Sequence, residues 1–367
     1  MKRIAIVSYN IRCNFTNYGS ALQSWALNES IKKMGYEPIL VDYCSNAHLN
    51  SDPLNPFKNM WDKDEESIKM CKEAMPFIEK NYYKFDDFYT NRFNRTDKKY
   101  DYTNFNEIVK DENVDGFVCG SDTIFCVDEF GIDDGFYANY DCMKNGYTVA
   151  YAASFGDSHI TEEQYKIIDE RLKNFKAIGL RESGMVPYIK SKVSIPVEKV
   201  LDPTLLLTSD EYSSLVLPRI ENNKYLLLYS RRDNPKMIEY AEKLAKERNL
   251  IIVDISLRQN KNHNMYYDAG VEEFLSLVKN AEFVVTNSFH GMIFSVQFRK
   301  NFVIFSREQC NTKITELIDL FGLNDRILVN GNEQYKEEID YDEVHNRIEK
   351  ERNKSIKFLK YELDNCK

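Results

Sequence analysis

The sequence predicts an α/β protein built from two Rossmann-like, doubly wound domains that face a cleft. Three observations lead to this prediction. The chain has 367 residues, which is long for a single core. Short apolar runs that fit buried strands alternate with segments of helical periodicity. This alternation comes in two series, one from residue 3 and another from about residue 224.

The first series opens with the apolar run 3–8, which reads as a buried strand. The following stretch, NFTNYGSALQSWALNESIKKMG, places its apolar residues on one helical face, with Gly35 as a plausible C-cap. PILVDY is the next strand. Together they form a β-α-β unit, which implies a parallel sheet with right-handed crossovers.

The sheet resumes with VDGFVCGSD and GYTVAYAASFG, and the helix TEEQYKIIDERLKNF follows with Thr161 as its N-cap. AIGLRESG is a strand that leads into a helix. VEKVLDPTLLL is short and extended and leaves the first domain, which we assign to residues 1–206.

Residues 45–110 interrupt this rhythm with polar, charged and aromatic sequence. We interpret them as helices and an irregular loop inserted into the first domain. Long insertions of this kind often form lids or binding loops, so we place the acceptor side of a site here.

The second series contains the strands KYLLLYS, LIIVDIS, AEFVVTN and NFVIF, which alternate with four helical segments. One of these, PKMIEYAEKLAKERN, has a proline in its first turn. We assign the second domain, the donor side, to residues 207–330. Residues 331–367 form a helical segment that is expected to pack back on the first domain. This is the architecture of the GT-B glycosyltransferases.

Composition excludes several classes of protein. The net charge is −9 with no basic stripe, so nucleic acid is not an expected partner. The eight cysteines form no C-x-x-C pair and the five histidines are dispersed, so we expect no metal site and no cofactor. The first residues have too short an apolar run for a signal peptide, and no run reaches the length of a membrane span. We therefore expect a reduced, cytoplasmic protein.

Ligands of open parallel sheets bind at the carboxyl ends of the strands. The chain carries small hydroxyl residues, glycines, arginines, a histidine and an aspartate at these ends, a set that suits an anionic substrate. The motifs G-x-G-x-x-G, G-x-x-x-x-G-K-[ST] and G-x-S-x-G are absent, which disfavours a dinucleotide fold, a P-loop and a hydrolase elbow. His290 follows the corner Thr286-Asn287-Ser288, where a helix start offers free N–H groups to an anion.

The segment TNSFHGMIFSVQF resembles the signature near the end of the polysaccharide pyruvyl transferase family. NYGSALQSWAL, G-S-D, S-F-G, R-E-S-G and LDPTLLL occur in the family's order, so the resemblance runs over roughly residues 1–330. One departure is Asn287, where the family often has Asp. The resemblance implies a GT-B-like fold and transfer of the pyruvyl group of phosphoenolpyruvate to two hydroxyls of a sugar. A cyclic pyruvate ketal forms and phosphate leaves.

This chemistry assigns roles to the strand-end residues. His290 fits the proton donor to the methylene carbon of phosphoenolpyruvate, and Asp122 fits the group that takes a proton from the sugar hydroxyl. Arg181 fits the residue that binds the carboxylate or the phosphate of phosphoenolpyruvate. The full set of predicted substrate-binding residues is Arg181, Ser288, Asn287, Phe289, Ser154, Ser121, Asn17, Tyr18, Gly19, Ser20 and Arg231.

Each residue also has a structural interpretation. His290 could be a polar corner residue, Arg181 could pair with an acid, and Asp122 could cap a helix. Residues 17–20 could be a helix cap, Arg231 could be solvated, and Asp202-Pro203-Thr204 reads best as a hinge.

Two alternative functions stay open: a GT-B glycosyltransferase that uses a nucleotide sugar, and a sugar-binding module without catalysis. The expected partners are phosphoenolpyruvate and a glycan or lipid-linked sugar, the latter bringing the protein to a membrane surface. The sequence does not determine the acceptor, the hydroxyl pair, the ketal stereochemistry, the general base, the metal dependence or the oligomeric state.

Overall fold

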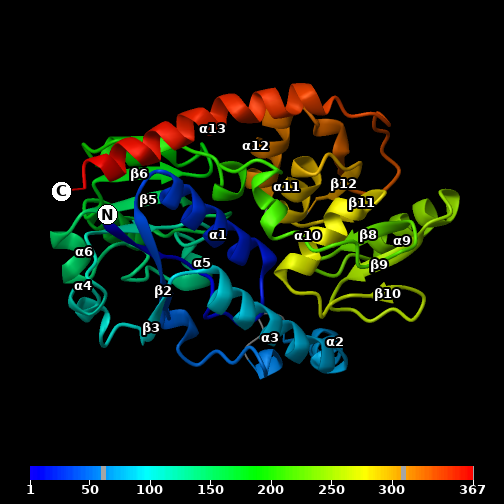
Figure 1. Cartoon of the computed structure of the whole chain (residues 1–367), viewed down its shortest axis with the longest axis horizontal. Helices are drawn as coiled ribbons and strands as arrows, with labels where there is room; N and C mark the ends of the chain where they lie inside the picture. The colour runs from blue at the N-terminus through cyan, green and yellow to red at the C-terminus, as the bar shows by residue number, and fades with distance from the viewer. Residues whose placement is uncertain (59–62, 307–310, 367) are drawn as a thin grey trace.

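The computed structural model describes residues 1–58, 63–306 and 311–366. Residues 59–62 of the expected insertion, residues 307–310 of the second domain, which include Cys310, and Lys367 lie outside the described residues. The chain folds into two α/β units, each built on a parallel sheet, which follow one another along the long axis of the molecule. One long helix runs across both units (Figure 1). The predicted α/β architecture with two sheets is therefore confirmed.

The first sheet has seven strands in the order β3-β2-β1-β4-β5-β6-β7, and all of its pairings are parallel. Strand order reverses at β1, which pairs with β2 on one side and β4 on the other. The strands are β1 (Arg3–Val7), β2 (Glu37–Tyr43), β3 (Arg95–Tyr100), β4 (Gly116–Cys119), β5 (Thr148–Ala153), β6 (Ala177–Leu180) and β7 (Val197–Lys199).

The second sheet has six strands in the order β10-β9-β8-β11-β12-β13, again all parallel. Its order reverses at β8. The strands are β8 (Tyr225–Tyr229), β9 (Ile251–Ile255), β10 (Asn264–Met265), β11 (Phe283–Thr286), β12 (Phe302–Phe305) and β13 (Ile327–Leu328). Their near-continuous burial is what a parallel sheet covered on both faces requires.

The α-helices cover both sheets and connect their strands. They are α1 (Tyr18–Lys33), α2 (Glu65–Glu73), α3 (Met75–Arg92), α4 (Ile108–Glu112), α5 (Val127–Phe130), α6 (Asp141–Asn145), α7 (Glu162–Leu172), α8 (Val186–Lys192), α9 (Pro235–Glu247), α10 (Val271–Asn280), α11 (Phe289–Gln297), α12 (Asn311–Phe321) and α13 (Tyr341–Asp364). Helix α1 ends at Lys33, and Met34, not the expected Gly35, is its C-cap. Gly35 follows with φ +91°, a conformation that glycine adopts without strain. None of the helices among these described residues is both long enough and apolar enough to cross a membrane.

Residues 45–110 contain the helices α2 and α3, as expected, and also a strand that was not expected. The segment 95–100 was expected in an irregular insertion, but it forms β3 and pairs with β2 at the sheet edge. Helix α3 packs between the domains, because Asn81 donates to the carbonyl of Ala269 and Lys84 Nζ lies 2.6 Å from Glu273 Oε2 on α10. The insertion therefore forms part of the interface between the two domains.

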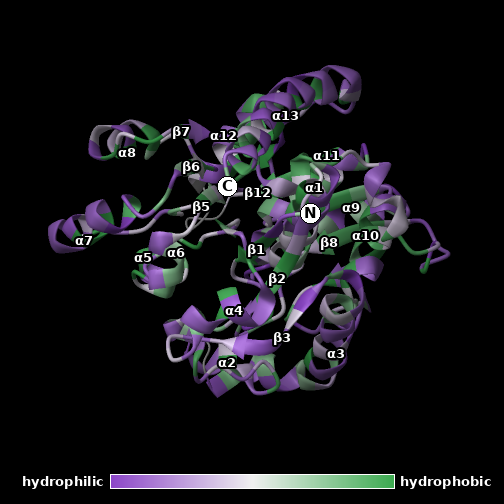
Figure 2. Cartoon of the chain, turned by 60° about the vertical axis from the view of Figure 1, so that its left-hand side comes forward, coloured by the Kyte–Doolittle hydropathy of each residue, from purple (hydrophilic) through white to green (hydrophobic). Residues whose placement is uncertain are grey.

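The domain interface is apolar at its centre. Tyr18 of α1 stacks on Phe274 of α10 with ring centroids 4.4 Å apart, and its hydroxyl donates to Ala269 O at 2.6 Å. Figure 2 shows hydrophobic residues on α10 and α11 where they lie beside α1. On another side, Glu316 of α12 accepts from the Ser183 hydroxyl at 2.7 Å, which ties α12 to the end of β6.

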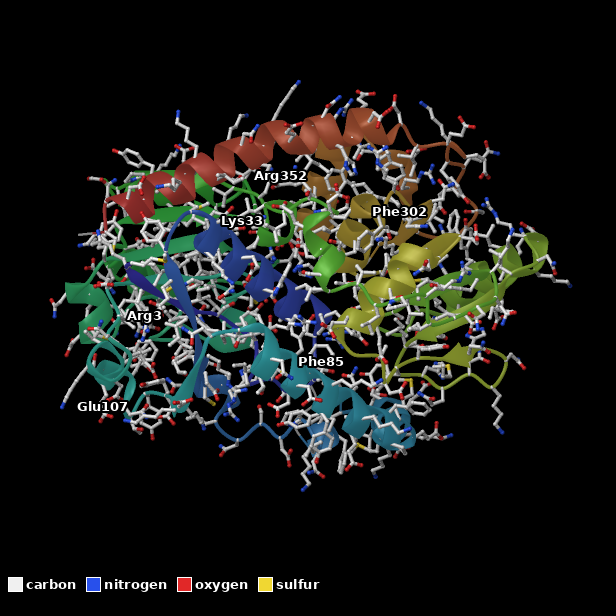
Figure 3. The ribbon with its side chains drawn as sticks, in the orientation of Figure 1. Arg3, Lys33, Phe85, Glu107, Phe302 and Arg352 are labelled. Atoms are coloured by element: carbon white, nitrogen blue, oxygen red, sulfur yellow. The ribbon has the colours of Figure 1, made fainter. Side chains whose placement is uncertain are left out.

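Helix α13 leaves the second domain and lies along the first (Figure 1). Arg352 lies on this helix (Figure 3). Its Nε donates to Leu205 O at 2.7 Å, and the Ser355 hydroxyl accepts from Leu201 N at 2.9 Å. The Cys366 thiol reaches Asp115 O at 3.4 Å, close to the start of β4. The last helix thus links the two domains at their back.

Candidate active site

His290 stands on a tight corner between β11 and α11. Thr286 Oγ1 accepts from Ser288 N at 3.0 Å, and the Ser288 side chain then caps the helix by accepting from Gly291 N at 3.2 Å. A methyl group on Gly291 would lie 2.5 Å from Thr286 Oγ1, so only glycine allows the corner to close this tightly. His290 is consequently held as the second residue of the helix.

The His290 ring lies between the two domains. One side packs against Gly19 of α1, where an added methyl group would come within 2.0 Å of Nδ1. On the other side, Nε2 lies 3.6 Å from Asp202 Oδ2. The edge of the ring meets Phe289 at an interplanar angle of 88°. These contacts fix the orientation of the imidazole.

Arg181, at the end of β6, is surrounded by buried carboxylates. Nη1 donates to Asp202 Oδ2 at 3.0 Å, Nη2 lies 3.8 Å from Asp122 Oδ1, and Nε lies 3.7 Å from Glu182 Oε1. The guanidinium also lies 5.0 Å from the centre of the Phe289 ring. Burial alone would raise the pKa of Asp202, but His290 and Arg181 outweigh it and hold that pKa well below its usual range.

Three donors of this cluster lack an acceptor. Within the described part of the chain, Arg181 Nε, Arg181 Nη2 and His290 Nε2 are buried without a hydrogen-bond partner. A buried donor without an acceptor costs about 1–3 kcal/mol, more when it is charged. A guanidinium and an imidazole with unused donors at one place therefore indicate a site for an anion.

Asp122 follows β4 and faces the same place. Its Oδ2 accepts from the Ser20 hydroxyl at 2.6 Å, and its Oδ1 accepts from Thr123 N at 2.9 Å. Burial would raise its pKa, but Arg181, then Lys313 and His290, lower it below the ordinary value. Asp122 also has φ +81°, which is unusual for a residue with a side chain and is often found at functional sites.

The structure therefore brings together six of the predicted site residues, namely Gly19, Ser20, Asp122, Arg181, Phe289 and His290. The other seven have different partners. Asn17 caps α1 through Gly19 N and Ser20 N, and Tyr18 packs at the domain interface. The Ser121 hydroxyl donates to Ala152 O, and the Ser154 hydroxyl donates to Glu182. Their roles as substrate contacts stay predictions, as does that of Ser288, the α11 cap.

Asn287 and Arg231 brace the loops of the second domain. Asn287 Oδ1 accepts from Arg231 N and its Nδ2 donates to Arg232 O, both at 2.8 Å. An aspartate could accept the first bond but could not donate the second, which gives a structural reason for Asn at this position. Arg231 Nη1 reaches across the interface to Thr16 O at 3.3 Å.

Three residues of the cluster were not among the predicted site residues, namely Asp202, Glu182 and Lys313. Nor was Glu129, which lies beside the cluster and accepts from the Thr123 hydroxyl at 2.8 Å. Asp202 was interpreted as part of a hinge, and it does cap the turn that follows through Thr204 N at 3.0 Å. Lys313 lies in the first turn of α12, where lysine usually faces solvent, yet its Nζ lies 5.6 Å from the centre of the Phe289 ring. No local sequence signal distinguishes it. No group of three metal-ligating side chains comes together in the residues that the structure describes.

Gly19→Ala should disturb the site through sterics alone. The added methyl group meets the His290 ring, which cannot move away without leaving Asp202. We expect a loss of about 1–3 kcal/mol in the free energy of unfolding, measured by urea titration. Gly184→Ala is the matched control, because nothing lies within 4 Å of its added methyl group, and it should change stability by less than about 0.5 kcal/mol. Equal losses in both variants would contradict the close contact.

Comparison with known proteins agrees with this architecture. S. aureus MnaA, solved with UDP, superposes with a TM-score of 0.52 at 13% identity, over 95% of this chain and 88% of that chain. The UDP-GlcNAc 2-epimerase of Neisseria meningitidis, solved with UDP-GlcNAc, gives a TM-score of 0.50 at 11% identity, over 100% and 94%. At these identities the likeness shows the fold alone, which is GT-B-like.

A search of curated proteins finds no match to the chain. A family model does match, over residues 17–309, and this range includes both the α1 start and the His290 corner. Its description is "Polysaccharide pyruvyl transferase". The chain belongs to the polysaccharide pyruvyl transferase family.

Proposed function

We propose that this protein moves the pyruvyl group of phosphoenolpyruvate onto two hydroxyls of a glycan or lipid-linked sugar, forming a pyruvate ketal and releasing phosphate. The observation that carries the proposal is the set of buried, unpaired donors on Arg181 and His290. Phosphoenolpyruvate offers a carboxylate and a phosphate in one small molecule. Its oxygens would supply the acceptors that these donors lack.

The residues take complementary roles in this proposal. Arg181 and Lys313 hold the anion from the first and second domains. His290 donates a proton to the methylene carbon, which leaves C2 open to attack, and Asp122 accepts the proton of the attacking hydroxyl. The Arg181 and Asp202 side chains are only 3% and 1% exposed, so we propose that the domains separate to admit the donor.

The location of the reaction is part of the proposal. The seven cysteines that the structure describes are all free, and most of them are buried. Free thiols in this number are typical of a reducing compartment, which favours the cytoplasm. A lipid-linked acceptor would be met there at the membrane surface.

Calorimetric titration with phosphoenolpyruvate tests the donor. We expect saturable binding, and we expect Lys313→Ala to weaken it about 10- to 100-fold, because a charged hydrogen bond contributes about 1.5–3 kcal/mol. Lys279→Ala is the matched control, since that ammonium also lies over a phenylalanine ring, Phe298, at 6.0 Å but belongs to α10. It should leave binding unchanged.

UDP-GlcNAc and a GDP-sugar are titrated in parallel. Tight binding of a nucleotide sugar, with no binding of phosphoenolpyruvate, would overturn pyruvyl transfer and favour the GT-B glycosyltransferase. This comparison matters because structures with the same fold hold UDP and UDP-GlcNAc.

A further inference from the structure

Formation of a ketal from two hydroxyls requires two separate deprotonations. Two hydroxyls each lose a proton. One proton is added to the methylene carbon, which becomes a methyl group, and the other leaves with the phosphate. Both new C–O bonds form at C2, where the C–O bond to phosphate breaks. A second proton acceptor would let each hydroxyl be deprotonated by a different group, and that acceptor must also give its proton up again to the phosphate.

Asp122, the proposed base for the first hydroxyl, is poorly suited to hold the second proton. Its two oxygens already accept from the Ser20 hydroxyl and from Thr123 N. Its pKa is lowered, so it stays ionised near neutral pH and releases any proton it receives. A different carboxyl group must hold a proton for part of the cycle.

Glu129 is linked to Asp122 by hydrogen bonds through a single intervening residue, Thr123. Thr123 connects them, because its N–H donates to Asp122 Oδ1 at 2.9 Å and its hydroxyl donates to Glu129 Oε2 at 2.8 Å. Glu129 belongs to the short helix α5 of the first domain (Figure 1) and is partly exposed, whereas Asp122 is buried. Solvent therefore reaches more of the Glu129 side chain than of the Asp122 side chain.

The charges around Glu129 come from both domains. Among the described residues, several titratable or charged groups lie around Glu129 and its helix α5. They are Asp122, Cys126, Tyr9, His48, Asp128, His159, Lys313 and Arg231. Burial, and after it the charge of Asp122, raises the pKa of Glu129 to about 7, although the Thr123 bond and the two cations oppose this. Burial lowers the pKa of His48 to about 4, so His48 stays neutral while Glu129 titrates.

We propose that Glu129 is a second acid–base residue, which accepts the proton of the second acceptor hydroxyl and passes it to the departing phosphate. This inference rests on the proposed pyruvyl transfer. The alternative is a structural role, in which Glu129 only anchors Thr123 beside Asp122. In the acid–base role the protonation state of Glu129 changes when the substrate binds and reacts. In the structural role it does not.

The first test needs no acceptor. Phosphoenolpyruvate binding is measured by calorimetry at pH 7 in two buffers of different ionisation enthalpy, which gives the number of protons taken up. With a pKa of about 7, Glu129 is only partly ionised at pH 7, and the anion should raise its protonated fraction, so Glu129→Gln should take up measurably fewer protons at similar affinity. The fraction that stays ionised is the form that acts as the base. Equal uptake by the variant and the unaltered protein would overturn the proposal. Absence of binding to the unaltered protein would instead overturn the proposed function.

The second test is a pH profile of phosphate release with a panel of methyl pyranosides as acceptors. Glu129 must be ionised to act as a base, so kcat/KM should fall as the pH drops below about 7. Glu129→Gln should lose this acidic limb and about 100-fold in kcat, with KM for phosphoenolpyruvate within about twofold. Glu362→Gln is the matched control, because burial also raises the pKa of that carboxyl and a hydroxyl, that of Tyr147, also donates to it.

Thr123→Val gives an independent check should Glu129→Gln fold poorly. The Thr123 hydroxyl lowers the pKa of Glu129, so its removal should move the acidic limb to higher pH. A limb that stays in place in Thr123→Val, or a Glu129→Gln enzyme with unchanged kcat and limb, would assign Glu129 a structural role only.

Discussion

Arg181→Ala should lower the free energy of unfolding by about 3–5 kcal/mol at pH 7, more than any other single change that we consider. The variant leaves Asp202, Glu182 and Asp122 buried without their shared cation. Asp202 is affected most, because its side chain is 1% exposed and it loses a 3.0 Å bond. Burying a carboxylate without a partner costs much more free energy than burying it as one member of an ion pair.

The cost should depend on pH in a defined direction. In the unaltered protein the pKa of Asp202 is held low, so its contribution to stability is present above the unfolded carboxyl pKa of about 4 and is lost in acid. Without Arg181 the same burial favours the protonated form. The difference between the two proteins should therefore shrink as the pH falls from 7 toward 4.

Arg258→Ala is the matched control for urea unfolding. That guanidinium also bonds two carboxylates, Asp233 and Glu66, but its side chain is 36% exposed. Exposed pairs contribute about 0–1 kcal/mol, and we expect a loss in that range. A loss from Arg181→Ala as small as that from Arg258→Ala would mean that the cluster is already open to water. The expected instability is also why Lys313, and not Arg181, is the better residue for testing donor binding.

The carboxyl ends of strands led to residues that the structure brings together. Asp122, Arg181 and His290 follow β4, β6 and β11, and parallel packing gathers such ends at one edge of each sheet. The contacts of His290 with the other two regions depend on how the two domains are arranged, which the sequence does not give. The 3.8 Å between Arg181 and Asp122 arises within the first sheet, but the packing of His290 against Gly19 joins the second domain to the first.

The missed residues show the limit of local patterns. Asp202 precedes a proline and caps a turn, so its local sequence explains it completely, and only the fold shows that its second oxygen faces Arg181 and His290. Lys313 looks like any lysine of an amphipathic helix. The strand β3, RTDKKY, has hardly any apolar residues, and it forms because the edge of β2 offers it unpaired backbone groups.

His290→Gln should reduce pyruvyl transfer by about 100- to 10,000-fold while leaving the protein folded. The ring nitrogen Nε2 is buried, faces Asp202 at 3.6 Å and has no hydrogen-bond partner among the described residues. Glutamine keeps a polar group of similar reach in this position but cannot release a proton. The loss should therefore appear in kcat, measured as phosphate release, with a smaller change in the affinity for phosphoenolpyruvate.

His345→Gln provides the comparison that separates chemistry from packing. Its ring is also partly buried and bonds the carbonyl of Val296 at 3.0 Å, yet it lies on α13, outside the cluster. This variant should keep full activity. If His290→Gln bound phosphoenolpyruvate normally and turned over within tenfold of the unaltered protein, the imidazole would only hold the anion. The proton for the methylene carbon would then have to come from another group, and Glu129, whose pKa is raised by burial to about 7, would be the first to examine.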